Sequence, residues 1–152
     1  MLIGLISDTH GQLYEDAYNA LKGVDAIIHA GDVGGPEIIT TLGKIAPVNA
    51  VRGNMDGGPW SSTLPLADML TFDGYSFYVL HDLYRLDLDP PAAGIQVVVS
   101  GHTHHASIKT IHGVLYCNPG SASQKRHGRP LSVGRLHLGE NGIRPEIITL
   151  DE

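Results

Sequence analysis

Disulfides, positive charge and long apolar runs are all scarce in this chain of 152 residues. Its single cysteine, Cys117, excludes an intrachain disulfide and fits a reducing compartment. Ten Lys and Arg residues stand against sixteen Asp and Glu residues, and the formal net charge of −6 argues against a surface that binds nucleic-acid phosphates. No apolar run approaches the roughly 18 residues that a membrane span needs, and the N-terminal run lacks the basic start of a signal peptide. We therefore expect a cytoplasmic protein with no membrane partner.

Glycine and histidine are the two residue types in excess, with 19 and 9 residues. Many tight turns and many candidate metal ligands are therefore available. A hydrophobic content of 42% with 17% charged residues is ordinary for a globular protein and excludes a mainly disordered chain. The length suits one domain with a proper core, so we predict a single domain over residues 1–152.

The first hundred residues contain short apolar runs that are continuous rather than alternating, a pattern typical of strands covered on both faces. These runs span residues 2–7, 26–30, 48–51 and 95–99. Residues 13–22 and 36–45 have the periodicity of helices, and Pro36 suits a first helical turn. The order βαβαβ, with right-handed crossovers, predicts a parallel sheet covered by helices.

Paired apolar runs around short turns predict three hairpins farther along the chain. They join residues 69–72 to 75–80, 107–111 to 114–117, and 131–138 to 143–150. Pro145 restricts the last of these strands to an edge or a bent position. Two loops rich in Gly, Ser and Pro, 54–63 and 119–130, have the least predicted secondary structure. Together these elements predict an α/β protein in which two sheets pack face to face and are flanked by helices.

Polar residues that can bind metals follow one predicted strand after another. They are Asp8, His10, Asp32, Asn54, His81, His102 and His104. In an open α/β sheet, the loops beyond the carboxyl ends of the strands share one rim, so these side chains should meet there. Within each of the pairs Asp8/His10 and His102/His104, the residues are two apart, and in extended backbone such side chains point to the same side.

Carboxylates and imidazoles together suit borderline divalent metals such as Mn, Fe, Co, Ni or Zn better than Ca or Mg. Two such ions with two aspartates and a bridging hydroxide would leave a positive pocket, which suits an anionic substrate such as a phosphate ester. Taken singly, Asp8 has a structural explanation as a helix N-cap, and Asp32 and Asn54 as turn residues. Their joint occurrence at matched strand ends favours a metal site. His29, inside an apolar strand, is instead expected to be a hydrogen-bonded core residue.

Five motifs occur in one order: Asp8-x-His10, Gly31-Asp32, Gly53-Asn54, His81 and Gly101-His102-x-His104. In that order they resemble the calcineurin-like metallophosphoesterase superfamily. The short length, the run Asn118-Pro119-Gly120-Ser121 and the form Gly53-Asn54-x-Asp56 resemble its small bacterial and archaeal phosphodiesterase branch. The resemblance implies a four-layer αββα sandwich of two mixed sheets with flanking helices. It also implies two metal ions, one held by Asp8, His10 and His104, the other by Asn54, His81 and His102, with Asp32 bridging them.

By that resemblance, the reaction is hydrolysis of a small phosphodiester or phosphate ester through in-line attack of a hydroxide held between the ions. Asp32, Asn54 and His81 are then the catalytic residues, and Mn is the first expectation for the metal, with Ni, Co, Fe and Zn as alternatives. Asn54 and Arg126 would contact the substrate, although a solvated basic loop explains Arg126 equally well.

Two positions depart from the family pattern. Many members have a histidine after the Gly-Asn pair, thought to stabilise or protonate the leaving group, where this chain has Met55. We therefore expect weak activity on alkoxide leaving groups and better activity on aryl diesters. Asp82 stands where the family usually has glycine, and it either alters the affinity of the second metal or faces solvent.

Two other functions stay open from the sequence. A similar fold serves as a scaffold subunit of the eukaryotic retromer complex with an altered metal site, but the ligand set here is complete, including His10. A nuclease would catalyse the same chemistry, but the acidic charge and the lack of an aromatic and basic stripe argue against nucleic acid as a partner. Edge strands and the loop 119–130 are candidate contacts for a homo-oligomer.

Overall fold

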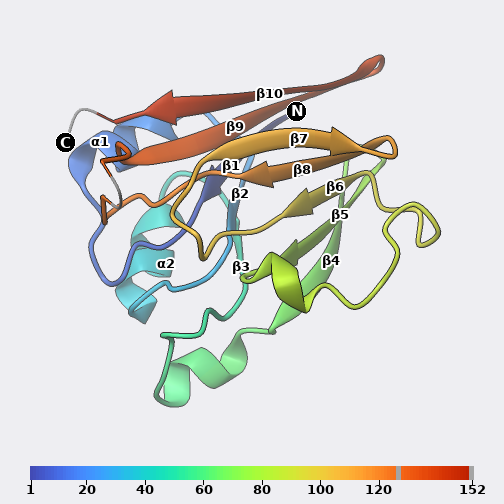
Figure 1. The fold of residues 1–152 in the computed structure, drawn as a ribbon. Helices are drawn as coiled ribbons and strands as arrows, with labels where there is room; N and C mark the ends of the chain where they lie inside the picture. The colour runs from blue at the N-terminus through green and yellow to red at the C-terminus, as the bar shows by residue number, and fades with distance from the viewer. Residues whose placement is uncertain (126–127, 151–152) are drawn as a thin grey trace.

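The structure is a computed structural model that describes residues 1–125 and 128–150 (Figure 1). One sheet contains β1 (Leu2–Ile6), β2 (Ala26–His29), β3 (Val48–Ala50), β9 (Ser132–Gly139) and β10 (Gly142–Thr149). The other contains β4 (Ala67–Phe72), β5 (Tyr75–Leu80), β6 (Val97–Val99), β7 (Ser107–Ile111) and β8 (Val114–Asn118). Within the described residues, the strand orders are β10-β9-β1-β2-β3 and β4-β5-β6-β8-β7.

The two sheets pack face to face, as predicted, because both strand sets present apolar side chains to the space between them. Ile3 and Leu5 of β1 share a buried cluster with Phe77 and Val79 of β5. Ile6, on the opposite face of β1, belongs to a second cluster under the helices. This two-sided burial explains why the run is continuously apolar.

Two helices, α1 (Glu15–Ala20) and α2 (Pro36–Leu42), cover the outer face of the first sheet. They connect β1, β2 and β3, which pair in parallel as predicted. Both helices are shorter than the predicted spans 13–22 and 36–45. Tyr14 is extended and forms the N-cap, so α1 begins at Glu15, two residues after the predicted start. The helix α2 ends where Gly43, a poor helix former, becomes its C-cap.

The three predicted hairpins are confirmed as the antiparallel pairs β4–β5, β7–β8 and β9–β10. Pro145 lies on β10, the edge strand of its sheet, as expected. The loop 54–63, predicted to lack structure, contains the 3-10 helix η1 (Pro59–Thr63). Hydroxyls of Ser61, Ser62 and Thr63 each donate to a backbone carbonyl three residues earlier, which stabilises this short helix.

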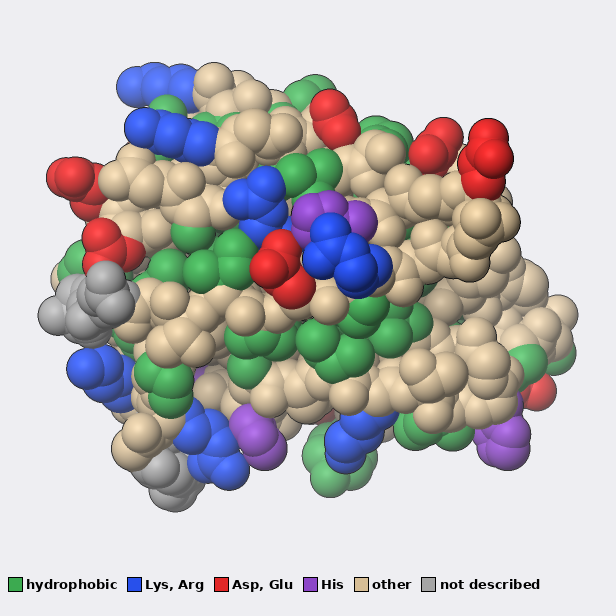
Figure 2. All heavy atoms as spheres, turned by 90° about the horizontal axis from the view of Figure 1, so that it is seen from above, with side chains coloured by type: hydrophobic (Ala, Val, Ile, Leu, Met, Phe, Trp, Pro, Cys, Tyr) green, Lys and Arg blue, Asp and Glu red, His purple; other side chains and the backbone are tan. Residues whose placement is uncertain are grey.

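The outer face of the second sheet is covered by a short 3-10 helix, η2 (Leu83–Arg85), and the chain that leads from it to β6. The face over β9 and β10, seen in Figure 2, intersperses acidic, basic and apolar side chains rather than a basic stripe. In the part of the chain that the structure describes, none of the helices is long and apolar enough to cross a membrane. The carboxyl ends of the parallel strands from both sheets open toward one region, which the predicted ligands occupy.

Candidate metal centre

The loops after four strands bring carboxylates and imidazoles of the predicted set together at one point. Asp8 and His10 follow β1, Asp32 follows β2, His81 follows β5 and His104 follows β6. The carboxylate oxygen Asp8 Oδ1 lies 3.3 Å from His104 Nε2, 3.7 Å from His10 Nε2 and 3.9 Å from His81 Nε2. Asp32 Oδ2 lies 3.3 Å from His81 Nε2 and 3.8 Å from His10 Nε2. Two groups, Asp8/His10/His104 and Asp8/Asp32/His81, each have ligand atoms within 4.8 Å of one another.

Three of these atoms fit a divalent cation for a physical reason. Asp8 Oδ1, His10 Nε2 and His81 Nε2 are buried and have no hydrogen-bond partner among the described residues. Leaving a buried carboxylate oxygen without a donor costs free energy, and Asp8 is fully buried. Metal ions at the two groups of ligand atoms would satisfy all three, because His10 belongs to one group, His81 to the other and Asp8 to both. Carboxylate with imidazole is a donor set that borderline divalent metals prefer.

Asp8 is held so that one oxygen faces this point. Its other oxygen, Oδ2, accepts hydrogen bonds from Ser7 Oγ at 2.6 Å and from the backbone N–H of His102 at 3.1 Å. The hydroxyls of Ser121 and Ser123 donate to the backbone carbonyl of Asp8 at 3.1 and 2.7 Å. These two serines fix the first ligand loop. The sequence analysis identified the run 118–121, which contains Ser121, only as part of the family resemblance and predicted no such contact.

His81 presents Nε2 to the carboxylates because its other nitrogen is occupied. Nδ1 lies 2.7 Å from the backbone carbonyl of Ala30, which can only accept, so Nδ1 carries the hydrogen. Burial works to lower the pKa of His81, but Asp32 and Asp8 outweigh it and raise that pKa above its ordinary value. Burial works to raise the pKa of Asp32, but His81 and the backbone N–H of Met55, 2.8 Å from Asp32 Oδ1, hold it below its ordinary value.

Five predicted ligands have left-handed backbone. The expectation of extended backbone at the pairs Asp8/His10 and His102/His104 is therefore wrong. The φ angles are 57° for Asp8, 47° for His10, 53° for Asp32, 74° for His102 and 62° for His104. Non-glycine residues adopt this region at a cost, and such residues cluster at functional sites. The pair Asp8/His10 still converges, but His102 and His104 point to different neighbours.

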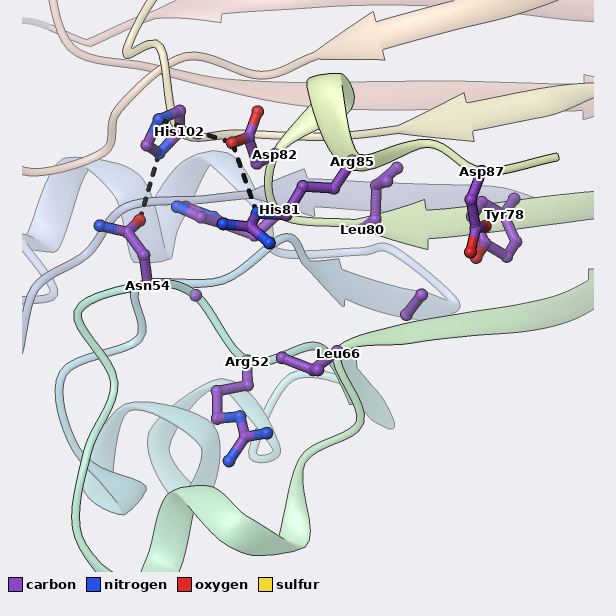
Figure 3. A pocket seen from close by; sticks show the side chains of 12 residues that line it. Arg52, Asn54, Leu66, Tyr78, Leu80, His81, Asp82, Arg85, Asp87 and His102 are labelled. Atoms are coloured by element: carbon purple, nitrogen blue, oxygen red, sulfur yellow. Dashed lines mark hydrogen bonds and ion pairs between the residues drawn. The ribbon is translucent and has the colours of Figure 1, made fainter.

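His102 lies with Asn54 and Asp82 beside His81 (Figure 3). Its Nδ1 is 3.2 Å from Asn54 Oδ1, its Nε2 is 4.0 Å from Asp82 Oδ2, and its ring centroid is 5.1 Å from that of His81. The structure therefore brings together the three residues predicted for the second metal. Asp82 faces His102 rather than solvent alone, with 25% of its side chain exposed. Its effect on the affinity of the second metal stays a prediction.

Two further residues that sequence reasoning did not assign to the site join the ligand loops. The carboxylate of Asp56 accepts backbone N–H groups of Gly53, Val33 and Gly34 at 2.9, 3.2 and 3.0 Å, which fastens the loop of Asn54 to that of Asp32. The sequence feature that singles out Asp56 is the form Gly53-Asn54-x-Asp56, which the sequence analysis used only for the family resemblance. In the same way, the side-chain amide of Asn118 donates to the carbonyl of Gly101 and to Thr103 Oγ1, at 3.0 and 3.2 Å.

Glycines permit the close approach of these loops. A Cβ on Gly53 would collide with the backbone nitrogen and carboxylate of Asp32. A Cβ on Gly101 would collide with the hydroxyl of Ser7, the donor to Asp8. Larger residues at either position would push a ligand loop away from the site.

His29 lies in the core beneath the site and is hydrogen-bonded, as expected from the sequence. Thr9 Oγ1 donates to the carbonyl of Val33 at 2.7 Å, so it accepts from His29 Nε2 at 3.0 Å. His29 Nδ1 accepts from the backbone N–H of Gly31 at 3.2 Å. Complete burial lowers the pKa of His29 to about 4, so the ring stays neutral near pH 7.

A cleft of about 590 Å³ opens beside the second group of predicted ligands. It is lined by Asn54, His81 and His102, by apolar side chains of the β4–β5 region, and by four charged residues, Arg52, Asp82, Arg85 and Asp87. Its size suits a small organic ester. Arg126, predicted to contact substrate, lies outside the described residues.

Comparisons with known proteins agree with this geometry. The model of the calcineurin-like phosphoesterase superfamily domain matches residues 1–141. A probable metallophosphoesterase of Methanocaldococcus jannaschii is 36% identical over 168 residues, which cover 100% of this chain and 83% of that protein. A probable metallophosphoesterase of Methanothermobacter thermautotrophicus is 34% identical over 160 residues, which cover 97% of this chain and 92% of that protein.

Solved structures share the fold. An archaeal phosphodiesterase superposes with a TM-score of 0.81 at 25% identity, covering 97% of this chain and 100% of that chain. Vps29 of Entamoeba histolytica in complex with Zn²⁺ superposes with a TM-score of 0.77 at 19% identity, covering 98% of this chain and 99% of that chain. At this lower identity the likeness shows the fold alone.

Proposed function

The chain belongs to the calcineurin-like phosphoesterase superfamily, and from that premise we propose that it is a phosphodiesterase that hydrolyses small phosphodiesters with two divalent ions. The observation that carries this proposal is the convergence of buried atoms that have no hydrogen-bond partner in residues 1–125 and 128–150: Asp8 Oδ1, His10 Nε2 and His81 Nε2. Metal-dependent hydrolysis of phosphate esters is the chemistry of the family. The number of ions and the diester substrate are the parts we propose.

The proposed assignment of ligands follows the contacts of the site. Asp8, His10 and His104 would hold one ion, because His10 Nε2 and His104 Nε2 lie 3.7 and 3.3 Å from Asp8 Oδ1. Asp32 would bridge to the other ion, since its Oδ2 lies between His10 and His81.

The second ion would be held by Asn54, His81 and His102, which line the cleft. Bound ions supply positive charge for the phosphate oxygens and bring the pKa of water close to neutrality. The residues of the chain position the substrate and hold the charges: Asn54 offers a neutral amide at the open side, and His81 keeps a fixed tautomer through Ala30. Mn is our first expectation for both ions, with Ni, Co, Fe and Zn as alternatives, because the donor set is mixed carboxylate and imidazole.

The test is hydrolysis of bis(p-nitrophenyl) phosphate by protein stripped of metal and then refilled with Mn. Asp8→Asn and His104→Ala should each lower the metal-dependent rate by roughly 100-fold or more, because each removes a ligand at the buried end of the site. The exposed neighbour His105→Ala is the matched control and should keep the wild-type rate.

Folded protein without turnover in Mn, Ni, Co, Fe or Zn would contradict the proposal. That result would favour a non-catalytic binding module of the same fold. Turnover that survives Asp8→Asn would place the chemistry elsewhere.

A further inference from the structure

The residue directly after Asn54, Met55, has no side-chain group able to donate a proton or to supply positive charge to a substrate. Met55 is 69% exposed, and its thioether has no N–H or O–H group. The backbone N–H of Met55 is already used by Asp32. Any cationic side chain that contacts a substrate phosphate in the cleft, beside the proposed ions, must therefore come from another residue.

Two described arginines line this cleft, and they point in different directions. The side chain of Arg52 points away from His81 and His102, whereas that of Arg85 extends back toward His81 and Asp82 (Figure 3). Arg85 is therefore the described cation that faces the predicted ligands from the cleft side. The same view makes Arg52 a matched control of equal charge.

Asp82 sits between Arg85 and His102. Its Oδ2 lies 4.0 Å from Arg85 Nε and 4.0 Å from His102 Nε2. Its Oδ1 accepts the backbone N–H of Tyr84 at 3.1 Å, which fixes this carboxylate at the start of η2. The contact with Asp82 is through Arg85 Nε, so the two terminal nitrogens remain as donors. With 86% of its side chain exposed, Arg85 is free to adjust to a bound anion.

We propose that Arg85 binds the phosphate oxygens of the substrate. The inference rests on the proposed function and adds the residue that recognises the substrate anion. A guanidinium forms paired hydrogen bonds with phosphate oxygens and stays protonated throughout the working pH range. Arg85 therefore contributes charge and orientation, and it does not replace the proton that a histidine at position 55 could deliver.

The experiment compares Arg85→Gln, Arg85→Lys and Arg52→Gln in Mn-loaded protein. For each variant, kcat/KM for bis(p-nitrophenyl) phosphate, the inhibition constant of inorganic phosphate and the Mn content are measured. Arg85→Gln should lower kcat/KM and weaken phosphate inhibition, each by about tenfold, because charge-assisted hydrogen bonds are lost. Arg85→Lys should recover part of both, Arg52→Gln should stay within about twofold of wild type, and the Mn content should not change.

Met55→His separates charge from proton delivery. Alone, it should raise the rate on alkyl diesters, whose leaving groups need a proton, and it should leave phosphate inhibition unchanged. Added to Arg85→Gln, it should not restore phosphate inhibition. No gain on alkyl esters would contradict the expected role of position 55.

Unchanged phosphate inhibition in Arg85→Gln would overturn the inference, as would an equal loss in Arg52→Gln. Failure of the proposed function gives a different pattern, because wild-type protein would then show no metal-dependent turnover at all. In that case, calorimetric titration of inorganic phosphate into wild-type and Arg85→Gln protein still tests Arg85, and equal affinities would overturn its role.

Discussion

The two halves of the ligand cluster differ in how firmly the fold holds them. Asp8 and His104 are 0% and 4% exposed, and Asp8 is fixed through both its carboxylate and its backbone carbonyl. Asn54 is exposed, and 39% of the His102 side chain is accessible. We call Asp8 and His104 the buried half, and Asn54 and His102, beside the cleft, the open half. His81, also predicted for the second ion, is 4% exposed and resembles the buried half.

This difference separates two tasks of one site. Buried groups locked by neighbours lose little freedom when they bind a metal, which favours affinity. Exposed groups such as Asn54 leave space for the substrate, which favours access. We therefore expect the first ion to bind more tightly than the second.

The largest expected effects on Mn binding come from removing one histidine from each half. His104→Ala should weaken binding of the first Mn ion by roughly 100-fold or more, because it takes a ligand from the buried half. His102→Ala should leave the first ion in place and lose the second. Calorimetric Mn titration with metal analysis would show stoichiometry near one for His102→Ala. Equal losses in both variants would mean that the halves do not differ.

A smaller effect on Mn affinity is expected when the hydrogen bonds that hold Asp8 in place are removed and every ligand is kept. The double variant Ser121→Ala with Ser123→Ala removes both hydroxyl donors to the backbone carbonyl of Asp8. Affinity for the first Mn ion should fall by about 10-fold to 100-fold, the usual effect of groups that orient metal ligands. Ser62→Ala, which removes a similar hydroxyl bond in η1, is the control and should bind Mn normally. Loss of only the second ion would contradict the view that these hydrogen bonds hold Asp8 in place for the first ion.

The smallest expected effect is a pH dependence of stability from His29, whose ring contacts Thr9 and Gly31 in the two loops that carry Asp8 and Asp32. In the folded chain the pKa of His29 is about 4, below the ordinary 6.5. Between these pH values the imidazole is protonated in the unfolded chain and neutral in the folded chain. Stability is therefore lost as pH falls from 6.5 toward 4, by about 1 kcal/mol at pH 5.5.

Urea unfolding of metal-free protein across this pH range measures that loss. His29→Gln cannot titrate and should show a flatter pH dependence, whereas the exposed His105→Gln should keep the wild-type slope. An unchanged slope in His29→Gln would mean that other groups carry the pH dependence.

The sequence predicted which strands form, how they pair and which residues follow their ends. These features follow from local patterns: apolar runs for buried strands, Asp73-Gly74 and His112-Gly113 for hairpin turns, and polar residues directly after a strand. The bridging, catalytic and metal-binding roles assigned to individual residues remain predictions, although the structure places the side chains together.

The contacts that aim the ligands could not be predicted, because they join segments far apart in the chain. Ser121 and Asp8 are separated by 113 residues, so their hydrogen bond depends on the packing of both sheets. Similarly, the form Gly53-Asn54-x-Asp56 singles out Asp56 but does not indicate that its carboxylate accepts the backbone N–H groups of Val33 and Gly34, more than 20 residues away. The left-handed backbone at Asp8 was also missed, since the same residue type often adopts extended backbone at a strand end.

The left-handed backbone of the ligand loops has a consequence for how such a protein can evolve. Each non-glycine residue in that conformation costs on the order of 1 kcal/mol, so the folded chain is less stable than one with relaxed loops. Substitutions to glycine at His102 or His104 would relieve strain while removing ligands. Selection for thermostability alone would thus tend to erase this centre, and its persistence in a lineage would itself be a sign that the bound state is used.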